Sequence, residues 1–267
     1  NSLLIILRMN TEVEIWDQNK KRLFEKPKIE YSIKSINSLI KSIKFCKEKL
    51  PNLNIKTILI DDNSTEKNLS RINDLVYAEN VEIINLETNK FNSFIKPQKN
   101  KETFSNLASL MRAFEIGKNQ GKDLIFFVED DYIHFEAMLE EMIVTYERIS
   151  SQISKDLFMC PSDYPYLYMN HTSSNILIGS KRHWRTINKT LCTFLTSKEL
   201  LEKYWENFIK TCEDRNEPFE KYLNNIYSKE VCISPLKALS IHMTNINSSY
   251  GLAPFIDYKR LWDENDK

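Results

Sequence analysis

The sequence predicts an α/β fold, a single domain in which helices flank a mostly parallel central sheet. Short apolar runs typical of buried strands alternate with longer segments of helical periodicity over the first 155 residues. The length of 267 residues allows one large domain with a sizeable core. Apolar residues make up 42% of the chain and charged residues 28%, a composition that is typical of folded proteins and excludes a disordered one.

The first 155 residues are expected to form the parallel part of the sheet. A continuous apolar run at residues 3–7 suits a strand buried on both faces, and further strands are expected at residues 55–60, 81–86 and 124–128. The helical segments between them imply parallel pairing with right-handed crossovers. Pro51 closes the first helix. The apolar residues at helical spacing that predict this helix are Ile29, Ile33, Ile36, Ile40 and Ile43.

After residue 155 the elements become shorter. Thr196 and Glu199 have the spacing of a capping box, which predicts the start of a helix rich in aromatic residues. A second helix is expected at residues 218–227. The short strands expected in this half lie at residues 157–160, 175–179, 191–195 and 231–233.

Charge and glycine content exclude several classes of binding protein. The 37 basic and 37 acidic side chains balance, which argues against a nucleic-acid partner held by bulk electrostatics. Only four glycines occur, so the chain has neither a P-loop nor a dinucleotide fingerprint, because both need clustered glycines. Any bound phosphate must therefore be held by a metal ion or by side chains.

The apolar runs and cysteines indicate where the protein works. The longest apolar run, residues 3–7, is far too short to span a bilayer and lacks the flanks of a signal peptide. The five cysteines are dispersed, which is typical of reduced thiols. We expect a cytoplasmic protein without a transmembrane segment, for which peripheral contact at the inner face of the membrane stays open.

Two predicted strands end in carboxylates. Residues 55–60 run into Asp61 and Asp62, and residues 124–128 run into Glu129, Asp130 and Asp131. In open parallel sheets, ligands bind at the carboxyl ends of the strands. Adjacent carboxylates repel one another, so a hard cation with a diphosphate is a natural complement to the second cluster. The alternative is that each cluster only caps the helix that follows it.

These strand ends, together with Arg8 at the end of the first strand, resemble the GT-A fold of nucleotide-sugar glycosyltransferases, particularly the family 2-like branch. The resemblance implies that Asp61 or Asp62 contacts the nucleoside. It also implies Glu129 near the ribose, with Asp130 as the alternative. By the same resemblance residues 1–155 bind the nucleotide-sugar and residues 156–267 bind the acceptor. Arg8 is a further candidate contact to the diphosphate or the base.

The resemblance also implies a metal site and a catalytic base. Asp131 would bind a divalent metal ion, Mn²⁺ or Mg²⁺, with His242 as a further ligand whose nitrogen favours Mn²⁺. Asp214 is the first candidate for the base that takes the proton of the acceptor hydroxyl, with Glu213 and Asp163 as substitutes. A solvated helix end explains residues 213 and 214 nearly as well.

Three other segments are weaker candidates. Tyrosines between residues 161 and 168 suit the binding of a sugar ring, although core packing explains them equally well. Arg182 and Arg185 could offset anionic charge on a donor or an acceptor. The polar segment at residues 244–257 could close over a bound donor.

The combined prediction is a metal-dependent, inverting glycosyltransferase. It would use a nucleoside diphosphate sugar, with a UDP-sugar as the first expectation, and a glycan or lipid-linked acceptor, in bacterial surface glycan synthesis. A sugar nucleotidyltransferase is one alternative, although residues 7–11 lack the glycine-rich loop such enzymes carry. A non-catalytic module that binds carbohydrate or a partner enzyme is the other.

Overall fold

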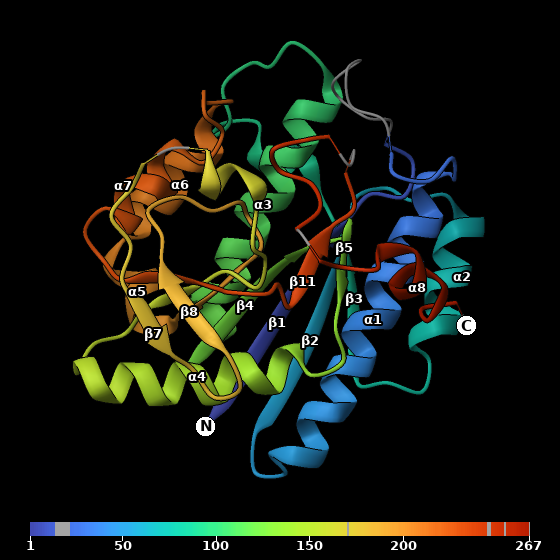
Figure 1. Cartoon of the computed structure of the whole chain (residues 1–267). Coiled ribbons are helices and arrows are strands. Elements are labelled where there is room, and N and C mark those ends of the chain that lie inside the picture. The colour runs from blue at the N-terminus through green and yellow to red at the C-terminus, as the bar shows by residue number, and fades with distance from the viewer. Residues whose placement is uncertain (14–21, 170, 245–246, 254, 267) are drawn as a thin grey trace.

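The computed structural model describes residues 1–13, 22–169, 171–244, 247–253 and 255–266, and its centre is a mixed sheet (Figure 1). In these ranges the sheet has nine strands in the order β3-β2-β1-β4-β9-β6-β10-β8-β7. The two predicted halves of the chain share this one sheet. Most of its strands run in the same direction and helices cover both faces, so the predicted fold class is confirmed.

The first half of the sheet is entirely parallel. Strand β1 (Ser2–Met9) lies between β2 (Asn54–Asp61) and β4 (Leu124–Glu129), and β3 (Val81–Asn85) pairs with β2. The register places Arg8 beside Glu129 and Met9 beside Asp61. The predicted acidic strand ends therefore lie at one edge of the sheet.

Alternation along β1 supplies both layers of the core. Leu3, Ile5 and Leu7 pack on one face, against helices α1 (Lys28–Lys49) and α4 (Met138–Ile153). Leu4 and Ile6 pack on the other face, against α3 (Lys101–Gln120) and helices of the second half. Successive side chains of a strand point to opposite faces, so a continuous apolar run fits a strand that is covered on both sides.

Of the helices in the first half, α2 (Glu66–Val76) and α3 begin at a side-chain cap. The Thr65 hydroxyl accepts a hydrogen bond from Asn68 N (3.4 Å) at the start of α2. The side-chain oxygen Oδ1 of Asn100 accepts one from Thr103 N (2.8 Å) at the start of α3. Each cap satisfies a backbone donor that has no partner within its helix. A 3₁₀ turn, η1 (Thr88–Phe91), lies between β3 and α3.

The second half adds strands of both directions to the sheet. Strand β9 (Phe194–Ser197) is antiparallel to β4 and to β6 (Phe158–Met159), and β8 (His183–Thr186) is antiparallel to β10 (Cys232–Pro235). Strand β7 (Ile176–Ile178) pairs with β8 at the edge. The 3₁₀ turn η2 (Pro165–Tyr168) and helix α7 (Lys221–Tyr227) also belong to this half.

The predicted aromatic helix of the second half begins differently from the expectation. Ser197, not Thr196, caps α5 (Lys198–Lys203), and its hydroxyl accepts a hydrogen bond from Leu200 N (3.0 Å). The helix is then interrupted at Tyr204 before α6 (Trp205–Glu213). The capping box was wrong by one residue: β9 runs through Thr196 to Ser197, and α5 begins only after Ser197, so the hydroxyl of this last strand residue is the one that reaches the N–H of Leu200.

A second, two-stranded sheet joins the two halves near the acidic strand ends. Strand β5 (Tyr132–His134) directly follows the acidic cluster and pairs antiparallel with β11 (Ser240–His242). This pairing places His242 beside Tyr132, although more than one hundred residues separate them in the chain. Helix α8 (Tyr258–Asp263) then packs beside α1 (Figure 1).

None of the helices in the described residues combines the length and the apolar character that crossing a membrane requires.

Candidate functional site

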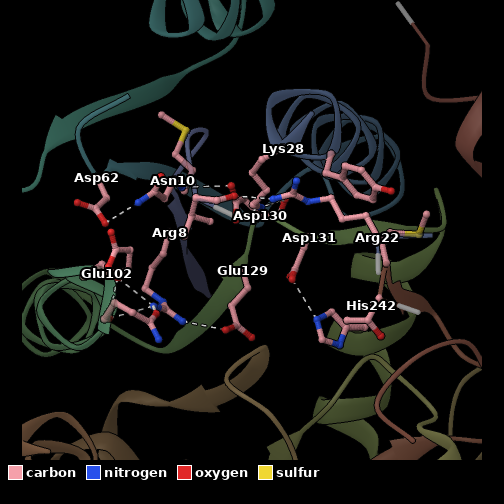
Figure 2. Close-up of a pocket in the computed structure, with 17 residues that line it drawn as sticks. Arg8, Asn10, Arg22, Lys28, Asp62, Glu102, Glu129, Asp130, Asp131 and His242 are labelled. Atoms are coloured by element: carbon pink, nitrogen blue, oxygen red, sulfur yellow. Dashed lines mark hydrogen bonds and ion pairs between the residues drawn. The ribbon is translucent and has the colours of Figure 1, made fainter. Parts of the chain in front are cut away.

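A cleft of about 300 Å³ lies at the carboxyl ends of β1, β2 and β4 (Figure 2). Its walls come from the ends of these strands, from the start of α1, from α3 and from β11. Five carboxylates and three permanent cations line it. These charged residues are Asp62, Glu102, Glu129, Asp130, Asp131, Arg8, Arg22 and Lys28. His242 lines the same cleft.

Glu129, the last residue of β4, is held by Arg8. The Arg8 Nη2 atom lies 3.0 Å from Glu129 Oε1, and Nη1 of the same guanidinium donates to Ser109 Oγ and Asn106 Oδ1, both at 3.0 Å. Burial raises the pKa of Glu129, and Arg8 opposes that rise by favouring the carboxylate. Arg8 and Glu129, each predicted as a site residue, thus form an ion pair that is anchored on α3. The Arg8 side chain is buried, and the Glu129 side chain is partly exposed to the cleft.

Asp130 faces α1 and its two carboxylate oxygens already have partners. Lys28 Nζ lies 2.6 Å from Oδ1, and Ser32 Oγ donates to Oδ2 at 2.6 Å. The amide of Asn10 also donates to Oδ2, at 3.2 Å. These contacts join the end of β1, the loop after β4 and the first turns of α1. In this arrangement Asp130 stabilises the walls of the cleft, and a ligand would have to compete with Lys28 and Ser32 for it.

Asp131 and His242 point toward each other across the cleft (Figure 2). Their Oδ2 and Nε2 atoms are 3.1 Å apart. The other oxygen, Asp131 Oδ1, is buried and has no hydrogen-bond partner in the described residues. Burial disfavours the Asp131 carboxylate, but the neighbouring His242 outweighs this and lowers the pKa of Asp131 far below its ordinary value. Burial likewise disfavours the imidazolium, yet Asp131 outweighs it and raises the pKa of His242.

The second nitrogen of His242 identifies which tautomer the fold favours. Nδ1 lies 2.9 Å from the Tyr250 carbonyl oxygen, which can only accept, so Nδ1 carries a hydrogen. In the neutral imidazole, Nε2 then carries a lone pair that faces a carboxylate oxygen. Two acceptors at 3.1 Å repel unless a cation lies between them, either a proton on Nε2 or a metal ion. The ring also stacks on Tyr132, with centroids 4.7 Å apart, which fixes its orientation.

These contacts fit a divalent cation that has two protein ligands. A buried carboxylate oxygen without a partner and an imidazole oriented through its other nitrogen are typical of metal sites. No group of three His, Cys, Asp or Glu side chains within the described ranges could hold a metal by itself. A cation here would therefore take its remaining ligands from a substrate and from water, as Mg²⁺ commonly does at phosphates.

Asp61 and Asp62 differ in their access to the cleft. Asp62 lines it and receives hydrogen bonds from Asn10 Nδ2 (3.0 Å) and from the Ser105 hydroxyl. Asp61 is buried, and its carboxylate accepts from the amide of Ser64 at 3.3–3.4 Å, which shapes the turn before α2. Burial raises the pKa of Asp61. Of the two, Asp62 has the position of a ligand-binding residue.

Glu213 and Asp214 do not line this cleft. Asp214 follows α6, where Gln98 Nε2 donates to its Oδ1 (3.0 Å) and Lys96 Nζ lies 3.8 Å from Oδ2. The hydrogen bond from Gln98 lowers the pKa of Asp214, which makes it a weaker base. The backbone carbonyl of Glu213 accepts from Lys96 N (2.9 Å). The structure joins this pair to the loop after β3.

The other candidate residues of the second half form ion pairs of their own. Arg185 Nη2 lies 2.6 Å from Asp163 Oδ1, and Tyr168 OH donates to Asp163 Oδ2 at 2.5 Å. Arg182 donates to the Lys237 carbonyl (2.7 Å). None of these residues lines the cleft. The predicted closing segment, residues 244–257, includes residues 245–246 and 254, which lie outside the described residues. Its first residue, Thr244, lines the cleft.

Lys28 and Arg22 are cleft residues that the sequence did not indicate. Both precede or begin α1, in a chain whose many lysines make any single basic residue uninformative. A signal was present in Ser32, four residues after Lys28, because two polar side chains at helical spacing can share one carboxylate. Which carboxylate they share depends on the packing of α1 against β5.

Comparison with known proteins gave structural likeness only. No protein-family profile matches this chain, and no curated protein does. TarS of S. aureus is 17% identical with a TM-score of 0.46, over 90% of this chain and 36% of that one. TarS residues 1–349 in complex with UDP is 15% identical with a TM-score of 0.48, over 90% of this chain and 60% of that one. UDP-glucose pyrophosphorylase in complex with UDP-glucose is 6% identical with a TM-score of 0.43, over 91% of this chain and 93% of that one.

The chain thus spans less than two thirds of the TarS structures that it resembles. At these identities and TM-scores the likeness does not extend to function, which depends on the site residues of this chain.

Proposed function

We propose that this chain is a glycosyltransferase that uses a nucleoside diphosphate sugar and a divalent metal ion. The observation that carries the proposal is the pair Asp131 and His242, whose Oδ2 and Nε2 atoms lie 3.1 Å apart in the cleft beside Asp131 Oδ1, a buried oxygen without a hydrogen-bond partner in the described residues. The pair lies in a cleft at the carboxyl ends of parallel strands, where such sheets bind ligands. Cleft carboxylates together with a diphosphate supply the oxygen ligands that hard cations prefer.

The residues of the cleft have separate roles in this proposal. Asp131 and His242 would hold the cation, with Mn²⁺ favoured by the imidazole nitrogen. When bound, the cation supplies positive charge to the diphosphate that leaves as the glycosidic bond breaks. Asp62, fixed by Asn10 and Ser105, faces the cleft as a contact for the nucleoside. Glu129, held by Arg8, is partly exposed and can accept from a ribose hydroxyl.

The proposal also includes inversion of configuration at the anomeric carbon and the chemical class of the acceptor. Inversion requires a base near the acceptor hydroxyl, and Asp214 or Glu213 can act only on an acceptor that reaches beyond the cleft. NMR analysis of the product anomer tests this step. A glycan or lipid-linked acceptor in surface glycan synthesis is the expected substrate. Tyr250, whose carbonyl orients His242 and whose side chain is exposed, offers an aromatic face for a sugar ring.

The test of the proposed function is calorimetric binding of UDP, GDP, ADP and CDP with and without Mn²⁺. We expect one nucleotide to bind in a metal-dependent way, because a metal ion that replaces the proton between Asp131 and His242 would join this pair to the diphosphate oxygens. Asp131→Asn should weaken that binding by tenfold or more, on the order of one charge-assisted contact. The matched control is Asp74→Asn, an exposed position on α2. Failure of every nucleotide to bind would overturn the proposal.

A further inference from the structure

Arg22 differs from the other permanent cations of the cleft in its partners. Arg8 and Lys28 each form an ion pair with a carboxylate of the acidic cluster. Arg22 lines the same cleft, yet none of its contacts with described residues is to a carboxylate. Its Nη2 donates to the Val13 carbonyl (2.5 Å), and its Cζ lies 5.8 Å from the centroid of the Tyr31 ring. The bond to Val13 uses one of the five N–H donors of the guanidinium.

The backbone near Arg22 is anchored from two helices. The Tyr31 hydroxyl, on α1, accepts from Phe24 N (2.6 Å) and donates to Phe24 O (2.7 Å). The Phe24 ring packs against Trp262 on α8, with centroids 4.3 Å apart. Trp262 also packs edge-on against Tyr31 at 4.8 Å. Arg22, two residues before Phe24, therefore enters the cleft from a segment with a defined position, and its guanidinium needs little reordering on binding.

The charges of the cleft define what Arg22 can bind. The acidic cluster is compensated residue by residue, because Glu129 pairs with Arg8, Asp130 with Lys28 and Asp131 with His242. A nucleoside diphosphate carries about three negative charges, so even with a divalent ion it would add net negative charge next to these pairs. Among the described residues, Arg22 is the permanent cation of the cleft that no carboxylate engages. The planar fork of a guanidinium matches two phosphate oxygens at once.

We infer that Arg22 is a binding residue for the β-phosphate of the donor, held in place by the aromatic contacts of Phe24, Tyr31 and Trp262. The inference rests on the proposed function. It adds a protein cation to a diphosphate that Asp131 and His242 contact through a metal. It also assigns a role to Arg22, which precedes α1 and which the acidic motifs of the sequence do not indicate.

The experiment compares UDP with UMP as calorimetric probes in the presence of Mn²⁺. Arg22→Gln should weaken UDP binding by about tenfold or more, the worth of a charge-assisted hydrogen bond, and change UMP binding by less than about threefold. Arg22→Lys should fall between, because an ammonium keeps the charge but loses the fork. Arg112→Gln is the matched control, since Arg112 is a half-exposed residue of α3 outside the cleft.

Each result decides between the alternatives. Equal weakening of UDP and UMP by Arg22→Gln, or no weakening of either, would overturn the inference while wild-type binding of UDP upholds the proposed function. A wild-type protein that binds no nucleoside diphosphate would contradict the proposed function and this inference with it. An unchanged melting temperature confirms that Arg22→Gln is folded.

Discussion

At the scale of single residues, three consecutive carboxylates coexist because each has a partner from a different segment. Arg8 comes from β1, Lys28 from α1 and His242 from β11. Burial is the main cause of the raised pKa of Glu129, and repulsion from Asp131 and Asp130 adds to it. The separate partners leave Asp131 ionised and directed into the cleft, and the one unpartnered buried oxygen of the cluster belongs to it.

His134 shows how a residue near the site serves the fold instead. Its Nδ1 lies 2.6 Å from Ser240 Oγ, its Nε2 is buried without a partner in the described residues, and burial lowers its pKa to about 3. The unfolded chain binds a proton near pH 6.5 while the folded one does not. The stability that the neutral ring contributes is therefore present above pH 6.5 and is lost as the pH falls toward 3.

We predict that His134→Asn flattens the acid limb of the stability curve. One proton bound only by the unfolded state costs about 1.4 kcal/mol per pH unit, or about 2 kcal/mol between pH 6.5 and pH 5. The free energy of unfolding in urea, measured at both pH values, should lose that much more in wild type than in His134→Asn. The exposed His171 supplies the control, His171→Asn. Equal slopes in wild type and His134→Asn would contradict the burial of a neutral ring.

At the scale of elements, helix α1 organises the cleft through its first turns. Lys28 and Ser32 hold Asp130, while Tyr31 between them anchors Phe24. The same helix also packs on α8, where the Tyr31 ring meets Trp262 and Lys34 Nζ donates to the Trp262 carbonyl (2.8 Å). The cleft wall and the C-terminal helix are thus coupled through one rigid element, and changes in α8 should reach the cleft.

We predict that Trp262→Leu weakens UDP binding severalfold through Arg22. Removal of the indole frees the Phe24 ring, so Arg22 must be ordered when the nucleotide binds. A double-mutant cycle with Arg22→Gln, measured by calorimetry, should show non-additive losses. Trp205→Leu, the same change in α6 away from the cleft, is the control. Additive losses from Trp262→Leu and Arg22→Gln would mean that α8 does not act through Arg22.

At the scale of the whole molecule, the second half of the chain reaches the cleft mainly through β11. The antiparallel pair of β5 and β11 brings His242 to Asp131. Helix α6 packs instead on α3, and its end lies beside residues 96–98. The arrangement thus separates the proposed metal ligands from the predicted base.

We predict from this separation that Asp214→Asn lowers the turnover number less than about tenfold. Its hydrogen bond from Gln98 and its position outside the cleft leave it poorly placed to take a proton from an acceptor bound beside Asp131. Asp131→Asn, assayed with the same donor, should lose far more. A loss of a hundredfold or more in Asp214→Asn, with donor binding unchanged, would instead establish Asp214 as the base and require an acceptor that spans both places.

The strands of the first half and the acidic residues at their carboxyl ends could be predicted from local pattern, because buried parallel strands are continuous apolar runs and their ends carry the polar residues. Period and turn chemistry are local properties, so residues 61–62 and 129–131 were recognisable without a structure. The predicted cap of the later helix was less accurate, since Thr196 and Ser197 both have the chemistry of a cap and only the length of β9 decides that the helix begins after Ser197.

The tertiary structure alone decided which carboxylate of the acidic cluster stabilises the cleft wall and which one faces the cleft. Asp130 and Asp131 are neighbours of identical chemistry, and only the turn into β5 directs one toward α1 and the other toward β11. Arg22 and Lys28 became cleft residues through the packing of α1, which no local pattern encodes. The partners of a charged side chain are set by long-range contacts, and those exist only once the elements have packed.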